Sequence, residues 1–255
     1  MLHPIKSLFL ILCLSLFFGY LTSSAAEEEL LVLTEKFPPF NYQEDNTIKG
    51  LSTQIVKELL KRVHLKCSIE LVPWTRAYNT ALNRPNTIIY TMAKTASRLN
   101  KFHWIGKISN RKVSLFRLRS RQDLASMTIE AAKEKATIAV TQGDASMETI
   151  REMGFSEKNI TAVRDVTTGN LGMKHVLKGR SDFFPSNPYM LKYRVKIGEV
   201  PDLFINQFVI HDADGYYIAA NIDTNPSIIK KLTDSYRELE EKGYIKQVVS
   251  EYLKF

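Results

Sequence analysis

One arginine in this sequence stands at a position suited to binding an anion. The segment from Leu71 to Ile108 contains an apolar strand, an amphipathic helix, a second apolar strand and then a polar turn with Arg98. Because α/β sheets bind ligands at the C-terminal ends of their strands, the turn after the strand 87–92 is a candidate site. We predict that the Arg98 guanidinium binds an anionic group, with Thr91 and Ala93 lining the site. A surface ion pair is the alternative role for Arg98.

A glycine turn farther along the chain offers a second place for an anion. The apolar strand 136–141 is followed by Gly143, Asp144 and Ala145, which lead into a helix. Such a turn exposes free backbone N–H groups and the positive end of the helix dipole. Asp144 is either the N-cap of this helix or a ligand contact, and as a contact it would repel an anion and attract an amine.

The elements that position these residues alternate between strand and helix patterns along the chain. The composition, 44% hydrophobic and 24% charged, is that of a globular protein with a substantial core. Two prolines exclude a continued central strand in the loop from Phe37 to Tyr42, of whose three aromatic side chains at least one is expected in the core. Gly50 precedes a helix with apolar residues at three- and four-residue spacing. The pattern indicates an α/β fold.

The N-terminus has the features of a secretory signal peptide. Lys6 precedes an apolar run, residues 8–21, and the small side chains of Ser24 and Ala26 favour cleavage after Ala26. About 14 apolar residues are too few to span a bilayer, for which about 20 are needed. Cys13 lacks the preceding small residues typical of a lipidated cysteine, so we expect a periplasmic product without a lipid anchor. Cleavage would leave Cys67 as the sole cysteine, which excludes an internal disulfide.

The chain is basic without a clear nucleic-acid-binding pattern. Lys6 is the only charged side chain in residues 1–26, so the chain after residue 26 keeps 34 basic and 27 acidic residues, a net charge of +7. The densest basic run, Arg111 to Arg121, is interpreted as a solvated face or a docking surface for a membrane partner. No element interleaves aromatic and basic residues, and we therefore predict no nucleic-acid partner.

Several segments resemble one known family when taken in order. A strand followed by T-x-x-R at residues 95–98 and F-x-W-x-G at residues 102–106 is similar to the extracellular solute-binding proteins of family 3, receptors of ABC importers for polar amino acids. The Pro-Pro-Phe at residues 38–40 and the G-R-x-D at residues 179–182 also resemble that family. The resemblance covers nearly all of the chain after the signal peptide.

The resemblance implies the two-lobe fold of type II periplasmic binding proteins. Each α/β lobe is then a mixed, mostly parallel sheet flanked by helices, and two crossover strands join the lobes around a ligand cleft that closes about a hinge. We place lobe 1 at residues 27–113 plus 206–255 and lobe 2 at residues 114–205. The return crossing is expected at residues 203–210, with a turn at residues 212–215.

The resemblance also suggests roles for individual residues. In the family, the arginine of the T-x-x-R motif binds the ligand carboxylate, and Arg98 stands at that position. Phe37 or Tyr42 is a candidate wall on which a ligand stacks, and Trp74 supplies further stacking surface. Arg76 is a second possible anion contact, with an exposed helix face as the alternative.

Two positions depart from the family pattern. Asp144 stands where family members have threonine or serine after the glycine. Asn187 stands where amino-acid receptors place the acid that holds the ligand ammonium, and an amide brings no charge. This weakens the case for an ordinary α-amino acid. Asn187 is alternatively the N-cap of a helix that begins with Pro188.

The expected function is capture of a small polar, carboxylate-bearing solute for an ABC importer by a monomeric periplasmic protein. The same fold could instead serve as a sensor for a membrane signalling partner. A small-molecule lyase or hydrolase on the same fold, with Asp144 as base and Arg98 as the anion contact, is a third and less favoured alternative. An enzyme is not predicted, because G-x-S-x-G, H-E-x-x-H and paired acids beside a histidine at a recognisable spacing are missing from the sequence. The sequence suggests neither a cofactor nor a metal site.

Overall fold

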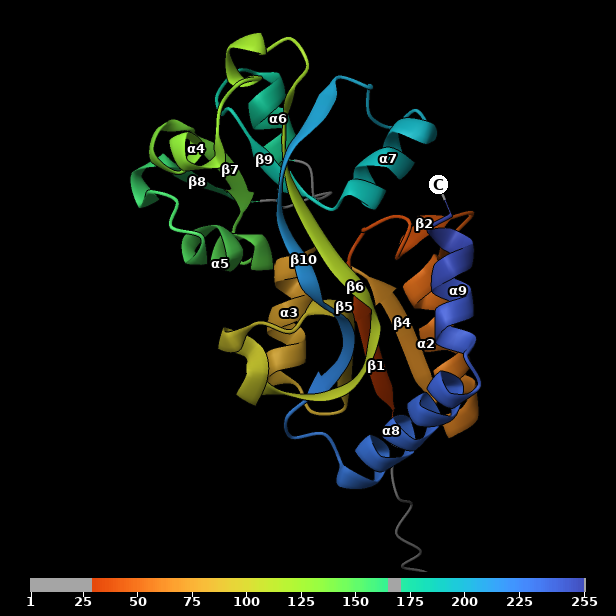
Figure 1. The fold of residues 1–255 in the computed structure, drawn as a ribbon. Helices are drawn as coiled ribbons and strands as arrows, with labels where there is room; N and C mark the ends of the chain where they lie inside the picture. Colours follow the sequence, from red (N-terminus) through yellow and green to blue (C-terminus); the bar gives the residue numbers. More distant parts are fainter. Residues whose placement is uncertain (1–28, 165–170, 255) are drawn as a thin grey trace, which may run out of the picture.

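The fold consists of two lobes joined by two long strands. The computed structural model describes residues 29–164 and 171–254; the signal peptide predicted at residues 1–26 lies outside them. Strands β6 (Phe102–Leu118) and β10 (Phe204–Asn221) pair antiparallel and run through both lobes (Figure 1). They belong to a six-stranded sheet with the order β4-β1-β5-β10-β6-β9. The α/β fold with crossover strands is confirmed.

The lower lobe in Figure 1 contains the parallel strands β4, β1 and β5 and both ends of the described chain. Every residue of β1 and β5 is buried, as expected for strands covered by helices on both faces. Its elements are β1 (Leu30–Thr34), β2 (Tyr42–Glu44), β3 (Thr47–Lys49), α2 (Leu51–Val63), β4 (Cys67–Leu71), α3 (Trp74–Asn83), β5 (Thr87–Ala93), η2 (Ala96–Lys101), α8 (Pro226–Glu241) and α9 (Tyr244–Tyr252).

The upper lobe has its own apolar core around the parallel pair β7 and β8 and the upper ends of the long strands. An isolated bridge between Ile138 and Phe183 links β7 to the segment that leads into β9. Its elements are η3 (Gln122–Leu124), α4 (Ile129–Lys135), β7 (Ile138–Thr141), α5 (Ala145–Glu152), η4 (Glu157–Asn159), β8 (Ile160–Val163), α6 (Leu171–Leu177), β9 (Phe184–Ser186) and α7 (Pro188–Lys196).

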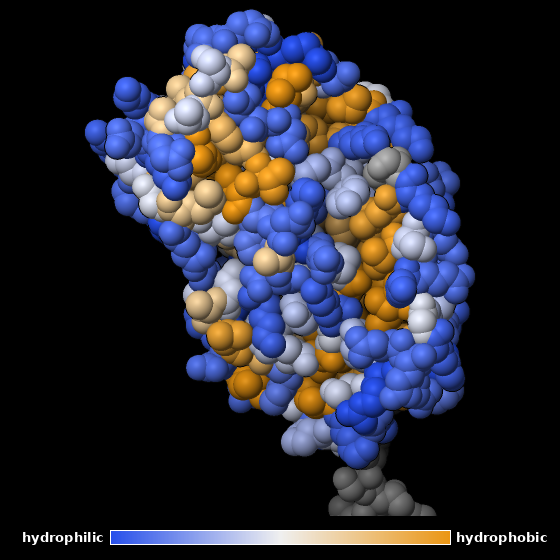
Figure 2. All heavy atoms as spheres, in the orientation of Figure 1, coloured by the Kyte–Doolittle hydropathy of each residue, from blue (hydrophilic) through white to orange (hydrophobic). Residues whose placement is uncertain are grey.

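The glycine of the F-x-W-x-G segment allows a helix to lie against β6. A Cβ atom on Gly106 would come within 2.1 Å of the Tyr236 ring of α8. The Tyr236 hydroxyl donates to the Lys107 carbonyl at 2.8 Å, so ring and strand are in direct contact. Beyond this contact, Figure 2 shows apolar atoms in the hollow between β6 and α9, lined by Ile108, Ile245 and Val249.

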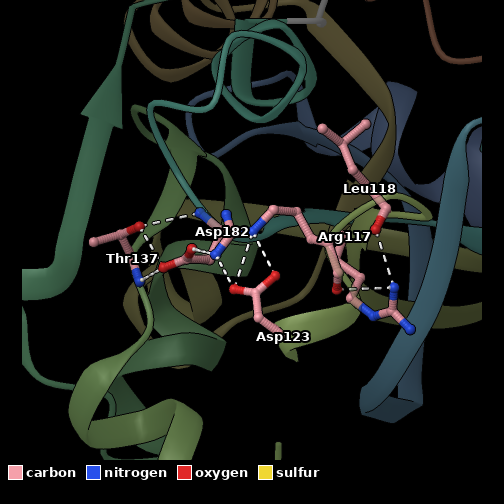
Figure 3. Close-up of polar contacts among 6 residues, drawn as sticks. Arg117, Leu118, Asp123, Thr137 and Asp182 are labelled. Carbon is pink, nitrogen blue, oxygen red and sulfur yellow. Dashed lines mark hydrogen bonds and ion pairs between the residues drawn. The ribbon is translucent and has the colours of Figure 1, made fainter. Parts of the chain in front are cut away.

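A polar network anchors the upper end of β6. Asp182 accepts from the backbone N–H and the hydroxyl of Thr137, both at 2.8 Å, and pairs with Arg121 at 2.9 Å. Arg117 donates to the Leu118 carbonyl nearby (Figure 3). These contacts fix β7 beside the end of β6 and give Asp182 a structural role.

One expectation about this region is wrong, and a second is contradicted in part. Residues 212–215 form no turn between separate strands, because β10 continues through them and absorbs the irregularity as register shifts between Ala213 and Tyr216. The basic run is only partly solvated, because Arg111 and Arg117 are 4% and 6% exposed. Alternation along β6 turns these two side chains inward, which a count of charges does not reveal.

Candidate functional site

Two neighbouring cavities lie between the lobes. The outer groove, of about 830 Å³, runs between α3 and α5, which face each other in Figure 1. The inner cavity, of about 100 Å³, lies deeper, between β5, β6, β9 and the start of α5. Both are lined by Trp74, Arg98, Asp144 and Ala145, which therefore form the boundary between them.

Arg98 is held at this boundary. It lies in η2, is 6% exposed, and donates from Nη1 to the Ala93 carbonyl at 3.1 Å and from Nη2 to the Gly143 carbonyl at 3.0 Å. Its guanidinium carbon lies 5.0 Å from the centre of the Trp74 ring and 5.1 Å from that of Tyr78. Burial lowers the pKa of Arg98, and the Asp144 charge opposes that shift. Among the described residues, no carboxylate forms an ion pair with Arg98.

Gly143 joins the lobes through its carbonyl oxygen. The oxygen accepts from Trp74 Nε1 at 3.1 Å as well as from Arg98, and both donors belong to the lower lobe. Gly143 has φ +77, in the left-handed region that glycine adopts without strain. The glycine turn thus presents a carbonyl to Arg98.

The two departures from the family pattern are both helix caps. Asp144 Oδ1 accepts from the Ser146 N–H at 2.6 Å and caps α5. Asn187 Oδ1 accepts from the N–H groups of Tyr189 and Met190 and caps α7, with Pro188 in the first turn. The N-cap readings are confirmed, and both side chains also line the inner cavity.

Thr91 occupies a strained backbone position beside the inner cavity. It has φ +62, although β-branched residues strongly disfavour the left-handed region. The register between β5 and β10 skips Thr91, which makes it a bulge, and its hydroxyl donates to Asn41 Oδ1 at 2.6 Å. Bulges of this kind redirect side chains at functional sites.

Arg111 belongs to the site, although the sequence predicts the basic run from Arg111 to Arg121 to be a solvated face or a docking surface. Its side chain lines the inner cavity from β6 and donates from Nη2 to Thr149 Oγ1 at 3.2 Å. Val113 and Leu115 follow Arg111 at two-residue spacing on the same face of the strand, and this apolar face is the sequence signal that could have identified Arg111 as buried.

The structure brings most of the predicted site residues together. Tyr42 lines neither cavity and instead packs on Tyr193 of α7, with ring centroids 5.6 Å apart. Arg76 and Gly143 line the outer groove. The inner cavity is lined by Phe37, Trp74, Thr91, Ala93, Arg98, Asp144, Ala145 and Asn187.

Contacts on both sides of the cleft connect the lobes. Lys36 Nζ pairs with Glu199 Oε1 at 2.8 Å, and the Ser97 hydroxyl donates to Glu148 Oε2 at 2.9 Å. Burial alone would raise the pKa of each glutamate, but hydrogen bonds and nearby positive charges lower it by more. For Glu199 these are Lys36 and Arg194, and for Glu148 they are hydrogen bonds with Thr95 and Ser97, so both pKa values lie below the ordinary value. The structure therefore has the lobes in contact.

The family model of the bacterial extracellular solute-binding proteins, family 3, matches residues 30–255. The chain belongs to this family. As a family 3 solute-binding protein it falls in a group of extracellular binding proteins rather than enzymes. No curated protein sequence matches the chain.

Solved structures with the same fold include proteins of different kinds. A histidine kinase sensor domain with similarity to periplasmic binding proteins has a TM-score of 0.76 at 11% identity. A putative L-cystine ABC transporter protein from Listeria monocytogenes has a TM-score of 0.72 at 18% identity. ArtJ, an arginine-, lysine- and histidine-binding protein from Geobacillus stearothermophilus, has a TM-score of 0.69 at 14% identity. Each alignment covers 89% of this chain and 96% of the other.

No helix in residues 29–164 or 171–254 is both long and apolar enough to cross a bilayer. Within the same ranges, no cluster of three or more His, Cys, Asp or Glu side chains could hold a metal ion.

Proposed function

We propose that this family 3 protein captures a small solute with a carboxylate or similar anionic group between its lobes and delivers it to an ABC importer. The observation that carries the proposal is Arg98, a buried guanidinium at the boundary of the two cavities without an ion-pair partner among the described residues. A buried charge without a counter-charge is unfavourable, and a ligand anion supplies one. The stacking on Trp74 and Tyr78 orients the guanidinium before a ligand arrives.

The proposal includes the order of events in binding. Lobe 1, residues 27–113 plus 206–255, and lobe 2, residues 114–205, open at β6 and β10, admit the solute and close on it. Phe37 and Trp74 then give apolar surface, while the backbone N–H groups of Gly143 and Ala145 add donors. No step involves covalent chemistry, a cofactor or a metal.

Ligand binding by wild type and variants tests this function. The purified protein is screened by thermal shift against amino acids, small carboxylates, polyamines and oligopeptides, and a ligand at 100 times its Kd should add about 2.7 kcal/mol to the free energy of unfolding. Arg98→Ala should weaken binding of the ligand found by about 100-fold or more. Arg117→Ala is the matched control, because Arg117 is equally buried but lines neither cavity. Normal binding by Arg98→Ala would refute the assignment.

A sensing role is the second candidate, supported by the similarity to a histidine kinase sensor domain. In that role the closed, liganded protein docks on a membrane signalling partner. Uptake of labelled ligand by cells lacking the gene separates the two functions. Loss of uptake supports transport, while normal uptake with a lost transcriptional response supports sensing.

Export completes the proposal. Residues 1–26 are a cleaved signal peptide, the product is periplasmic without a lipid anchor, and it acts as a monomer. N-terminal sequencing of the exported protein should begin at Glu27, and an uncleaved or lipid-modified N-terminus would contradict this.

A further inference from the structure

The inner cavity contains a second buried cation, Arg111. Its side chain is 4% exposed and makes one hydrogen bond, from Nη2 to Thr149 Oγ1 at 3.2 Å. Within residues 29–164 and 171–254, no carboxylate forms an ion pair with it. Arg98 and Arg111 therefore line one cavity of about 100 Å³ from two different elements, η2 and β6.

Two guanidiniums so placed destabilise each other until an anion is bound. Burial lowers the pKa of Arg98, the charges of Asp144 and Glu148 oppose that shift, and the charge of Arg111 adds a smaller lowering. Desolvated like charges are unfavourable, and a ligand with negative charge at both guanidiniums removes the repulsion and the lack of partners together.

The other charged groups of the cavity are largely engaged in the protein itself. Lys36 pairs with Glu199 on the opposite lobe. Asp144 uses Oδ1 to cap α5, and its charge partly offsets that of Arg98. Glu35 is the remaining acid of the lining and has an interaction of its own within the protein. Three cations and two carboxylates thus leave the lining net positive.

Neutral groups around the cavity are hydrogen-bond donors. Ser186 Oγ is buried and has no hydrogen-bond partner among the described residues, while the buried Asn187 side chain interacts with the Tyr216 phenol. The Tyr216 phenol also lines the cavity, and burial raises its pKa to about 12, so it keeps its proton at neutral pH. Buried polar groups without partners are rare in folded proteins, and Ser186 lines the same cavity as the two arginines. A ligand rich in acceptor oxygens would satisfy this hydroxyl.

The volume of the cavity sets a size limit. About 100 Å³ is well below the roughly 300–1,000 Å³ of drug-sized ligand sites. With the lobes in contact as described, only a compact ligand of few heavy atoms fits.

We propose that the inner cavity binds a compact dicarboxylate, with one carboxylate on Arg98 and the other on Arg111, in preference to a zwitterionic amino acid. This rests on the proposed receptor function and specifies its ligand class. Bidentate guanidinium–carboxylate pairing gives each end a defined geometry.

Calorimetry with matched small molecules tests the ligand class. Malonate is compared with propionate and glycine, in which a methyl group or an ammonium replaces one carboxylate, and succinate with butyrate and β-alanine in the same way. At least one dicarboxylate should bind about 10- to 100-fold more tightly than both of its matched analogues. Equal binding of the monocarboxylate, or tighter binding of the amino acid, would overturn the inference.

Variants of Arg111 connect the preference to this residue. Arg111→Met should reduce dicarboxylate affinity to that of the monocarboxylate and leave monocarboxylate affinity almost unchanged, whereas Arg111→Lys should retain part of the preference. Arg117→Met is the matched control, since Arg117 lies on the same face of β6, is also buried, and bonds Gln207 instead. The control should keep the wild-type preference.

A structural role for Arg111 predicts a different result. If Arg111 only supports the fold, Arg111→Met should lower the Tm of the ligand-free protein and weaken all ligands alike. If it binds the second carboxylate, the ligand-free Tm should be unchanged or higher, because a buried unpaired charge has been removed.

The two proposals fail in different ways. Binding of amino acids through Arg98, without an effect of Arg111→Met, would refute the dicarboxylate and leave the receptor function intact. If no compound of the panel binds, dicarboxylates included, both the receptor function and the dicarboxylate preference are refuted.

Discussion

Arg98 and Gly143 connect the lobes through one hydrogen bond, from Arg98 Nη2 to the Gly143 carbonyl at 3.0 Å. The same oxygen accepts from Trp74, so two lower-lobe side chains meet one upper-lobe backbone atom. The proposed anion contact is therefore also a closing contact, and anything that moves the Gly143 peptide should affect both affinity and lobe closure.

Replacing Gly143 by alanine should disturb closure through the backbone. The added Cβ would meet nothing nearer than Trp74 Nε1 at 3.9 Å, so there is no steric clash. The left-handed φ of +77 is instead expected to destabilise the protein by about 1–2 kcal/mol in chemical denaturation. Ligand affinity should fall as well, because the peptide that meets Arg98 and Trp74 would shift.

Gly154→Ala is the matched control for that experiment. Gly154 also has a left-handed φ, of +85, and a Cβ there would meet no atom within 4 Å. It should reduce the free energy of unfolding by a similar amount without changing affinity. Equal losses of affinity in the two variants would show that the effect of Gly143→Ala is global.

The sequence predicted the fold and the position of Arg98 because both depend on local patterns. Buried strands, helix periodicity and caps are encoded within a few residues, as the N-caps at Asp144 and Asn187 show. Arg98 could be placed because it directly follows a buried strand.

Contacts between distant segments could not be predicted in the same way. The burial of Arg111 depends on α5, whose Thr149 lies 38 residues later in the chain. The turn predicted at residues 212–215 does not form because pairing with β6 continues through it. Phe37 and Tyr42 are alternative stacking candidates in the same loop, but Tyr42 packs on Tyr193 of the other lobe. Such outcomes depend on tertiary packing, which local propensity does not encode.

The contact between Gly106 and Tyr236 should respond non-additively to mutation. Gly106→Ala introduces a Cβ that would lie 2.1 Å from the Tyr236 ring, and overpacking of this kind destabilises by about 1–3 kcal/mol. In Gly106→Ala/Tyr236→Ala the clash is absent, so the loss measured by denaturation should be smaller than the sum of the single losses. Additive losses would show that the ring moves away freely.

The pair Lys36–Glu199 should favour the closed arrangement. Both side chains are partly exposed, so the pair is expected to contribute about 0.5–1 kcal/mol to closure, or a 2- to 5-fold change in the ratio of closed to open molecules. Lys36→Met should increase the radius of gyration of the ligand-free protein in X-ray scattering. Lys230→Met breaks an ion pair within α8 and should leave the radius unchanged.

Lobe closure should weaken in acid, because glutamates on both sides of the cleft are held by the other lobe. The pKa values of Glu148 and Glu199 lie below the ordinary value in spite of burial, through the contacts with Ser97 and Lys36. A carboxylate with a lowered pKa stabilises the state that lowers it. That contribution is complete above the ordinary pKa and is lost as the pH falls through the lowered value. Trp74 fluorescence and the radius of gyration should therefore report opening on the acid side of the ordinary glutamate pKa, while the far-UV spectrum stays native. Glu148→Gln/Glu199→Gln should abolish this transition, and an unchanged transition in that variant would assign the opening to other groups.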